Sequence, residues 1–561
     1  MYALKLATLL VSLGLCLGEK TPKVTTKLGI IRGHYKISNN GNKYKAFEGV
    51  PYALPPVGDK RFEVPVSIEP WTGELEANKV KRTCFSYDRE VFPLGKYLDG
   101  TEDCLYMNIY APMTRNASLP VLVYIHGGAF QYGTYMENEA YYLIDHDVIY
   151  VAINYRLGIL GFLSTEDDIV PGNMGLKDQS LALRWIKENI ESFGGDPNRI
   201  TITGLSAGGA SVHYHYMSPL SKGLFQNGIS FSGTAFNCWA QTENSREKAI
   251  KLGSLMGCPT EDVALMVQCL KEIPARNLTE AVTLFMPWQL MPFTPFGPVI
   301  EKPSETAFIT RSPAEILASG EYYDVPWITG VVSEEGLYPI AEFAENDTVL
   351  RDLDANWEEL APILLDFNYT LPEEEHPMTA KRIREFYFGD RPINRENIGI
   401  LIDLSSDRFF SADAVKVAKI HATTSQSPVW FYYYSHRAVN SLSEGTLHNA
   451  HDYGVCHGDD VYMVLGNDEI IPSKRQEDLA VQKILIQLWT SVAHDRYPKL
   501  EVEWSKVDSV QGKLSEANFN FLHIAGPDQL NQNHSIEFIH TSFWSSLGLD
   551  ENIVKRAHIM E

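Results

Sequence analysis

The chain has 561 residues, of which 44% are apolar and 11% aromatic, which is ample for a large buried core. A formal net charge of −23 argues against nucleic acid or an anionic membrane as a partner. No linker rich in Pro, Gly or Ser and no block of like charge divides the chain, so we expect one large domain over residues 19–561.

Residues 1–18 have the pattern of a secretory signal that is removed from the mature protein. Lys5 precedes an apolar run at 6–17, with small residues at Cys16 and Gly18. The alternative is an N-terminal membrane anchor, for which the run is short. No other stretch approaches a transmembrane segment, and the polar C-terminus does not match a lipid-anchor signal. We therefore expect a secreted, extracellular protein without a transmembrane anchor.

Cysteines and glycosylation acceptors agree with that compartment. Removal of the signal leaves six cysteines, which allow fifteen complete pairings, so the residues alone leave the connectivity open: Cys84, Cys104, Cys238, Cys258, Cys269 and Cys456. Five acceptor sequons are consistent with passage through the secretory route: Asn116, Asn277, Asn346, Asn368 and Asn533.

Apolar runs without polar alternation predict the buried strands of a mostly parallel sheet. These runs lie at 121–125, 148–154, 200–203, 228–231, 327–332 and 429–434. Between them, Leu183, Ile186, Ile190 and Phe193 recur at helical spacing and predict an amphipathic helix that ends before Gly194. The alternation predicts an α/β fold, which binds ligands at the carboxyl ends of its strands.

The stretch FGGDPNRITITGLSAG at 193–208 places a serine between two glycines directly after a short β-branched strand. Gly204 and Gly208 lack the side chains that would collide where the chain reverses into a helix. This is the pattern of a nucleophile elbow with Ser206 at its apex. The pentapeptide around Ser206 alone would also fit an ordinary surface turn.

With Phe193, Gly194 and Gly195, the stretch resembles the active-serine signature of the type-B carboxylesterase/lipase family at every defined position. A second family signature is matched by EDCLYMNIYAP at 102–112, where Met107 replaces the usual branched aliphatic residue or Thr. Further similar segments extend over nearly the whole chain: FEGVPYA at 47–53, NYRLGILGF at 154–162, GNMGLKDQSLALRWI at 172–186 and GVCHGDD at 454–460.

Leu205 in the elbow and HYHYMSP at 213–219 make the chain most similar to the secreted insect carboxylesterases. The resemblance implies an α/β-hydrolase fold, in which helices flank a large, mostly parallel, twisted central sheet. It also implies a chemistry, ester hydrolysis through an acyl-enzyme, that needs no cofactor and no metal.

The same resemblance implies two disulfides, Cys84–Cys104 and Cys258–Cys269. Cys238 and Cys456 would then remain free thiols. Two ion pairs of the family scaffold are also implied, Arg61 with Glu102 and Arg156 with Asp178.

For the acid of a Ser-His-Glu triad, Glu335 follows the predicted strand at 327–332 and directly precedes Gly336, as the family acid does. Glu334 is the competing assignment, and its simpler interpretation is a solvated or structural neighbour. The order along the chain, serine, acid and then histidine, is that of an α/β-hydrolase.

The base is expected on the loop after the strand at 429–434. His457 lies between Gly454 and Gly458 and matches the histidine motif of the family. His448 and His451 lie in the same loop and are interpreted as surface or internally hydrogen-bonded residues. The segment 448–460 contains three histidines, a cysteine and three aspartates, which suggests a metal site as an alternative. Their spacing, however, fits no recognised structural zinc pattern.

The loop HGGAF at 126–130 follows a predicted strand and resembles the glycine-rich oxyanion loop of the family. By that resemblance the oxyanion donors are the backbone N–H groups of Gly128, Ala129 and Ala207. Ser232 resembles a serine that supports the acid and the base. His126, His213 and His215 are interpreted as packing residues.

The expected substrates are small to medium apolar esters, including xenobiotic, pheromone or hormone esters, with organophosphates or carbamates as covalent inhibitors. The segment 286–296 is expected to shape the acyl pocket, although core packing explains its aromatic composition equally well. A choline esterase would carry Trp within 85–103 and Glu in place of Leu205, and a juvenile-hormone esterase usually has Gln there. A non-catalytic adhesion protein of the same fold would have lost a member of the triad. The oligomeric state stays open.

Overall fold

The computed structural model describes residues 21–87, 98–114, 118–135, 140–447, 451–466, 473–510, 518–535, 539–549 and 551. The predicted signal at 1–18, the sequon at Asn116 and His448 lie outside these residues. Within them, no helix combines the length and the apolar character that crossing a membrane requires.

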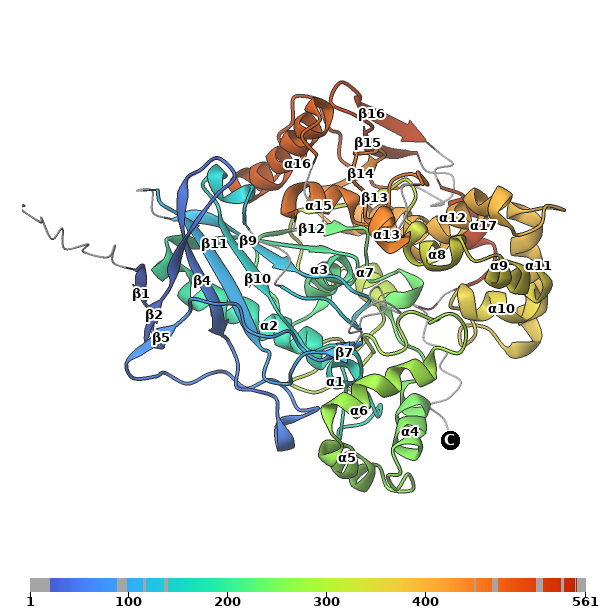
Figure 1. Ribbon diagram of the computed structural model, residues 1–561, viewed down its shortest axis with the longest axis horizontal. Coiled ribbons are helices and arrows are strands. Elements are labelled where there is room, and N and C mark those ends of the chain that lie inside the picture. The colour runs from blue at the N-terminus through green and yellow to red at the C-terminus, as the bar shows by residue number, and fades with distance from the viewer. Residues whose placement is uncertain are drawn as a thin grey trace, which may run out of the picture.

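A central sheet of eleven described strands forms the middle of the molecule (Figure 1). Six neighbouring pairs are parallel and run from β10 to β15, and the pairs at both edges are antiparallel. The spatial order is β16 (Leu530–Ser535), β15 (Phe519–Ile524), β14 (Val429–Tyr434), β13 (Trp327–Val332), β12 (Asn227–Phe231), β11 (Gly195–Leu205), β9 (Leu119–Ile125), β10 (Ile149–Ile153), β8 (Tyr106–Pro112), β4 (Lys43–Pro51) and β3 (His34–Ile37).

All six predicted strand runs are strands of this sheet, and the predicted mostly parallel α/β architecture is confirmed. Their uninterrupted apolar character has a physical cause, because each strand is buried on both faces. In β9, Val121 and Val123 point into one apolar core, whereas Leu122 and Tyr124 point into another. The sheet therefore separates two cores.

Helices cover both faces of the sheet. Residues of α2, α3 and α13 belong to the same core as Val121, whereas Leu485, Trp489 and Val492 of α16 belong to the core on the opposite face. The α-helices are α1 (Gly158–Phe162), α2 (Met174–Asn189), α3 (Ala207–Met217), α4 (Ser245–Leu255), α5 (Val263–Glu272), α6 (Ala275–Glu280), α7 (Pro313–Ser319), α8 (Leu337–Ala344), α9 (Asp347–Ala355), α10 (Trp357–Leu364), α11 (His376–Tyr387), α12 (Ile398–Ser406), α13 (Ala412–Thr424), α14 (Leu442–Leu447), α15 (Asp459–Leu465), α16 (Gln476–Asp495) and α17 (Thr541–Ser545).

Two further features lie at opposite ends of the molecule (Figure 1). At one end lies a small sheet of three strands, β1 (Lys23–Thr25), β2 (Ile30–Arg32) and β5 (Glu74–Glu76). Helices α9 to α12 and α17 gather at the other end, and a short π-helix, Asp407–Ser411, joins α12 to α13. Separately, β6 (Ser86–Tyr87) and β7 (Leu98–Asp99) form a two-stranded antiparallel sheet.

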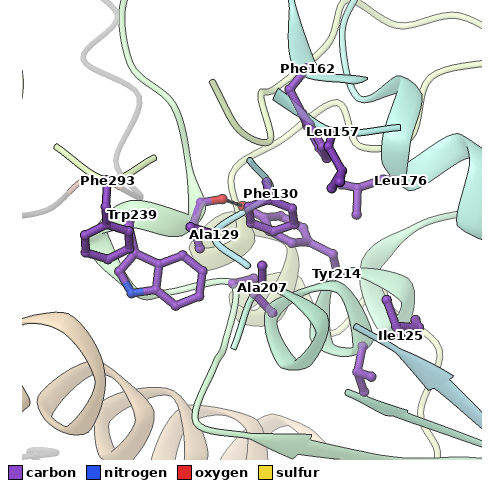
Figure 2. Packing of buried hydrophobic residues seen from close by; sticks show 14 of the residues in the cluster. Ile125, Ala129, Phe130, Leu157, Phe162, Leu176, Ala207, Tyr214, Trp239 and Phe293 are labelled. Carbon is purple, nitrogen blue, oxygen red and sulfur yellow. Dashed lines mark hydrogen bonds between the residues drawn. The ribbon is translucent and has the colours of Figure 1, made fainter. Parts of the chain in front are cut away.

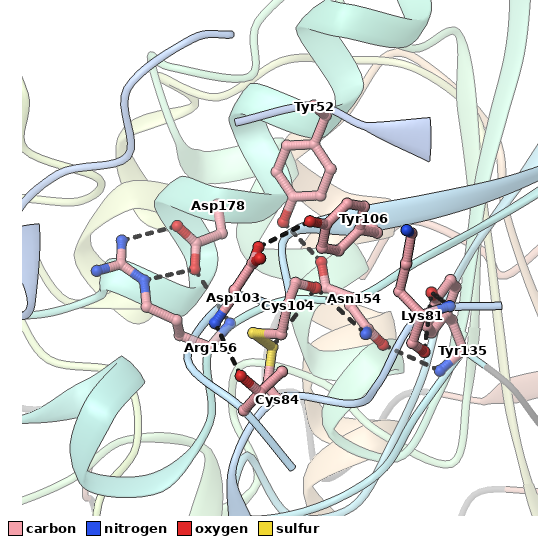
Figure 3. The surroundings of a disulfide bond; sticks show 11 residues. Tyr52, Lys81, Cys84, Asp103, Cys104, Tyr106, Tyr135, Asn154, Arg156 and Asp178 are labelled. Carbon is pink, nitrogen blue, oxygen red and sulfur yellow. Dashed lines mark hydrogen bonds and ion pairs between the residues drawn. A yellow bond between two sulfur atoms is a disulfide. The ribbon is translucent and has the colours of Figure 1, made fainter. Parts of the chain in front are cut away.

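Disulfides and buried ion pairs cross-link segments that surround the central sheet. Cys84 is bonded to Cys104 and Cys258 to Cys269, the pairing that the family resemblance implies, while Cys238 and Cys456 are buried and lie outside these two disulfides. Beside the first disulfide, Arg156 donates to Asp178 through Nε at 2.8 Å and through a terminal nitrogen at 2.7 Å (Figure 3). The implied pair of Arg61 and Glu102 is also present, with Nε 2.6 Å from the carboxylate.

Two buried histidines, His213 of α3 and His421 of α13, stack on Trp327. The ring of His213 lies 4.4 Å from that of Trp327, and the ring of His421 lies 4.9 Å from it. Neither ring nitrogen of His421 has a hydrogen-bond partner among the described residues. Burial without a partner disfavours the imidazolium and lowers the pKa of His421 to about 3.

His421 should make the protein less stable in acid. Between pH 6.5 and about 3 the unfolded chain binds a proton on His421 that the folded chain does not, so stability falls as pH falls. We expect His421→Phe to reduce this dependence by about 1.4 kcal/mol per pH unit below pH 6. Urea unfolding at pH 4.5, 5.5 and 8 measures it, and an unchanged slope would contradict the interpretation.

Candidate functional site

Ser206 lies between β11 and α3 in a strained backbone conformation. Its φ of 58° and ψ of −121° are costly for a residue with a side chain, and the N–H of Ser206 is held by Phe231 O at 2.8 Å. A Cβ on Gly208 would lie 2.0 Å from Ile125 O, so only glycine fits there. The predicted turn is therefore a strand-to-helix elbow with Ser206 at the N-terminus of α3, 6% exposed.

The loop after β9 lies against this elbow. A Cβ on Gly127 would lie 3.1 Å from the Cβ of Ser206, which places the loop beside the serine. Gly128 and Ala129 have φ angles of 100° and 53°, so the chain turns sharply here. Among the described residues, the N–H groups of Gly128, Ala129 and Ala207 have no hydrogen-bond acceptor. The loop, with Gly128 and Ala129, and the elbow, with Ala207, thus have three backbone donors near Ser206.

Glu335 and His457 meet at the carboxyl ends of β13 and β14. His457 Nδ1 lies 2.5 Å from Glu335 Oε2, and Val332 N donates to the other carboxylate oxygen at 2.8 Å. Glu335 is completely buried, and a buried carboxylate needs such donors. Because a carboxylate only accepts, this contact places a proton on Nδ1 and leaves Nε2 as the acceptor nitrogen. Nε2 is buried and has no partner among the described residues.

Glu334, the competing acid, binds the loop before His457 and not the imidazole. Its carboxylate accepts from Val455 N at 2.6 Å and from Ser333 Oγ at 2.5 Å. A Cβ on Gly454 would lie 2.4 Å from the same carboxylate. Glu334 therefore braces the loop that carries His457, while only Glu335 contacts the imidazole.

Two aspartates after His457 hold the same loop. Asp459 Oδ2 accepts from Cys456 N at 2.8 Å and from Ser441 Oγ at 2.7 Å, and burial raises the pKa of Asp459 to about 7. Asp460 accepts from Tyr432 OH at 2.5 Å, and burial, with a contribution from Glu335, raises its pKa to about 6. These aspartates were part of the predicted histidine motif, but sequence reasoning did not assign them a task.

Aromatic rings that the sequence did not single out surround His457. Phe410 lies 4.4 Å and Tyr338 5.4 Å from the imidazole, measured between ring centroids. Phe293 packs on Tyr338 at 5.5 Å and on Trp239 at 6.0 Å. Figure 2 shows Trp239 and Phe293 in the same packed group as Ala129 and Ala207. The site is therefore walled by apolar rings.

Part of the predicted segment 286–296 reaches this wall. Phe293 belongs to this segment, and Gln131, just after the loop at 126–130, donates to Phe296 O. Tyr132 OH, one residue further, lies 2.8 Å from Tyr338 OH.

Other predicted residues lie outside this cluster of contacts. Ser232 Oγ has no hydrogen-bond partner among the described residues and does not bond the acid or the base. His451 is exposed and packs on Tyr453. His126 and His215 are buried, and the pKa of each is lowered by burial, to about 4 and about 3. Within the described ranges, no group of three His, Cys, Asp or Glu side chains is arranged to hold a metal ion.

The chain matches known proteins over nearly its whole length. The model of the carboxylesterase family matches residues 20–538. Venom carboxylesterase-6 of Apis mellifera is 47% identical over 98% of this chain and 100% of its own, and a carboxylic ester hydrolase of Bombus ignitus is 47% identical over 95% of each.

A solved structure agrees with these relatives. The juvenile hormone esterase of Manduca sexta, with OTFP covalently attached, superposes with a TM-score of 0.83 at 28% identity. The match covers 94% of this chain and 99% of that one. The chain therefore belongs to the carboxylesterase family and is a carboxylic ester hydrolase with the α/β-hydrolase fold.

Proposed function

We propose that this esterase acts through a catalytic triad of Ser206, His457 and Glu335. The observation that carries the proposal is the 2.5 Å contact between His457 Nδ1 and Glu335 Oε2, which leaves Nε2 as an acceptor. Leu205, next to Ser206, packs on the loop of His457, since a Cβ on Gly458 would lie 3.0 Å from Leu205 Cδ2. This contact supports a serine close to the imidazole, and the hydrogen bond between nucleophile and base often tightens only with substrate bound.

The reaction proceeds in two steps. Nε2 of His457 takes the proton of Ser206 Oγ while the oxygen attacks the ester carbonyl carbon, and the carbonyl oxygen becomes an oxyanion. When the tetrahedral intermediate collapses, the alcohol leaves with the proton from His457, and the acyl group stays on Ser206. Water then attacks the acyl-enzyme with the same proton transfers, which releases the acid and restores Ser206. Glu335 holds the imidazole in the productive tautomer throughout.

The oxyanion is stabilised by the N–H groups of Gly128, Ala129 and Ala207. These groups lack acceptors among the described residues, so no hydrogen bond within the protein has to break when the oxyanion forms. Ala129 contributes through its main chain, so a methyl group at this position does not remove a donor. Ala207 is at the N-terminus of α3, where the helix dipole also favours negative charge.

Apolar esters of small to medium size are the proposed substrates. Phe410, Tyr338, Phe293 and Trp239 offer ring surface and few hydrogen-bonding groups, which suits alkyl or aryl groups better than charged ones. A panel of p-nitrophenyl acetate, butyrate and octanoate, juvenile hormone and acetylthiocholine tests this. Preference for acetylthiocholine would contradict it, and preference for juvenile hormone would instead assign a juvenile-hormone esterase specificity.

The mature enzyme is proposed to be secreted as one domain, residues 19–561, after removal of residues 1–18. The two disulfides support an oxidising compartment. Of the sequon asparagines, Asn277 and Asn346 are exposed, while Asn368 and Asn533 are half-buried. Glycosidase treatment of protein from the culture medium of insect cells should therefore reduce its mass.

Ser206→Ala tests the nucleophile. Without Oγ no acyl-enzyme can form, so we expect kcat to fall by about 10⁵-fold or more and covalent labelling by an organophosphate to disappear. Hydrolysis of p-nitrophenyl butyrate and mass spectrometry of the labelled protein measure the two effects. Substantial turnover in the purified variant would refute the assignment.

A matched pair of substitutions distinguishes the two neighbouring acids. Glu335→Gln removes the charge that orients His457, and we expect kcat to fall by about 10³-fold to 10⁴-fold. Glu334→Gln should stay close to the wild-type value, because an amide oxygen can still accept from Val455 N and Ser333 Oγ. If Glu334→Gln instead shows the larger loss, the acid is Glu334.

A further inference from the structure

The last described segment of the chain, residues 539–549 and 551, holds the π-helix that packs on His457. We call this segment the C-terminal strap. Its helix α17 packs beside α13 and α11 (Figure 1), and Trp544 Nε1 donates to Tyr387 OH of α11 at 2.8 Å. The strap, which is far along the chain, thus packs on the helices next to the site.

Both charged residues at the start of the π-helix bind the strap. His540 Nδ1 lies 2.7 Å from Asp407 Oδ2, and Arg408 donates to the carboxylate of Glu551. The second pair is buried, since each side chain is 4% exposed. Arg408 also donates to Leu365 O at 2.8 Å and lies over the ring of Trp544. A buried guanidinium that loses its carboxylate is strongly destabilised, so Glu551 fixes where Arg408 sits.

The π-helix connects Arg408 to the site. Trp239 Nε1 donates to Phe409 O at 2.7 Å, and Asn237 Nδ2 donates to the carbonyls of Phe409 and Phe410 at 2.9 and 3.0 Å. Phe410 is two residues after Arg408, and its ring centroid lies 4.4 Å from that of His457. Single π-helical turns are rare in proteins, and many of those that occur lie at functional sites.

We propose that Arg408 and Glu551 are positioning residues for the catalytic base. Their buried ion pair fixes the π-helix, and the π-helix presses Phe410 against one face of the imidazole of His457. This inference rests on the proposed role of His457 as the base. The face contact sets the ring plane, while Glu335 sets the direction of Nδ1, so the two together determine where Nε2 points.

A double-mutant cycle tests whether Glu551 acts through Phe410. We expect Glu551→Gln to lower kcat by about tenfold or more with little change in KM, because a small misplacement of the base is costly. It should also shift the pH profile of kcat/KM, which reports the ionisation of the base in the free enzyme. Phe410→Leu should behave similarly, and the double variant should lose no more than Phe410→Leu alone. Titration of Ser206 with an organophosphate normalises every rate to the number of folded sites.

The matched control is Glu321→Gln. Glu321 also pairs with an arginine, Arg311, but both are exposed and the pair has no contact with the π-helix, so kcat and the pH profile should not change. If Glu551→Gln gives no folded protein, Glu551→Asp carries the same test, because it keeps the charge and shortens the side chain.

Two results would overturn the proposal: wild-type kcat and pH profile in the Glu551 variant, or losses that simply add in the double variant. Either can occur while Ser206→Ala is inactive, and the proposed triad would then stand. Activity in Ser206→Ala would refute the triad instead.

Discussion

The close approach of the elbow to the sheet is the constraint on which the rest of the site depends. A Cβ on Gly208 would meet Ile125 O at 2.0 Å, and one on Gly233 would meet Ser206 O at the same distance. Both clashes are with backbone, which cannot move aside without displacing a strand. The ends of β9, β11 and β12 and the start of α3 therefore form one rigid unit around Ser206. The strain in the φ and ψ of Ser206 persists because this packing allows no other path.

The neighbouring strands supply the remaining groups at the same edge of the sheet. β13 ends just before Glu335, and the loop with His457 follows β14, the next strand in the sheet. Glu335 has no exposed surface, so its charge depends on Val332 N and His457 Nδ1 for stabilisation. Glu335 and His457 thus hold each other in place, and Glu334 and Asp459 hold the loop that carries His457.

Local patterns predicted much of this arrangement. The six apolar runs were strands because each is buried on both faces, and the glycines around Ser206 were informative because a side chain there would clash with backbone. The antiparallel edge strands β3, β4, β8 and β16 were not predicted, since polar residues interrupt their apolar runs. Phe410 and the pair of Arg408 with Glu551 were missed for a different reason, because that pair joins residues 143 positions apart. The support expected from Ser232 is absent from its observed contacts, because a resemblance assigns a residue type and not a hydrogen bond.

Leu205 connects the elbow to the loop of His457. It adjoins Ser206, the proposed nucleophile, and it packs on Gly458, directly after His457, the proposed base. A larger residue at this position would press on that loop. Divergence at position 205 would therefore change the placement of the proposed nucleophile and of the proposed base together, and a lineage that altered one would have to readjust the other.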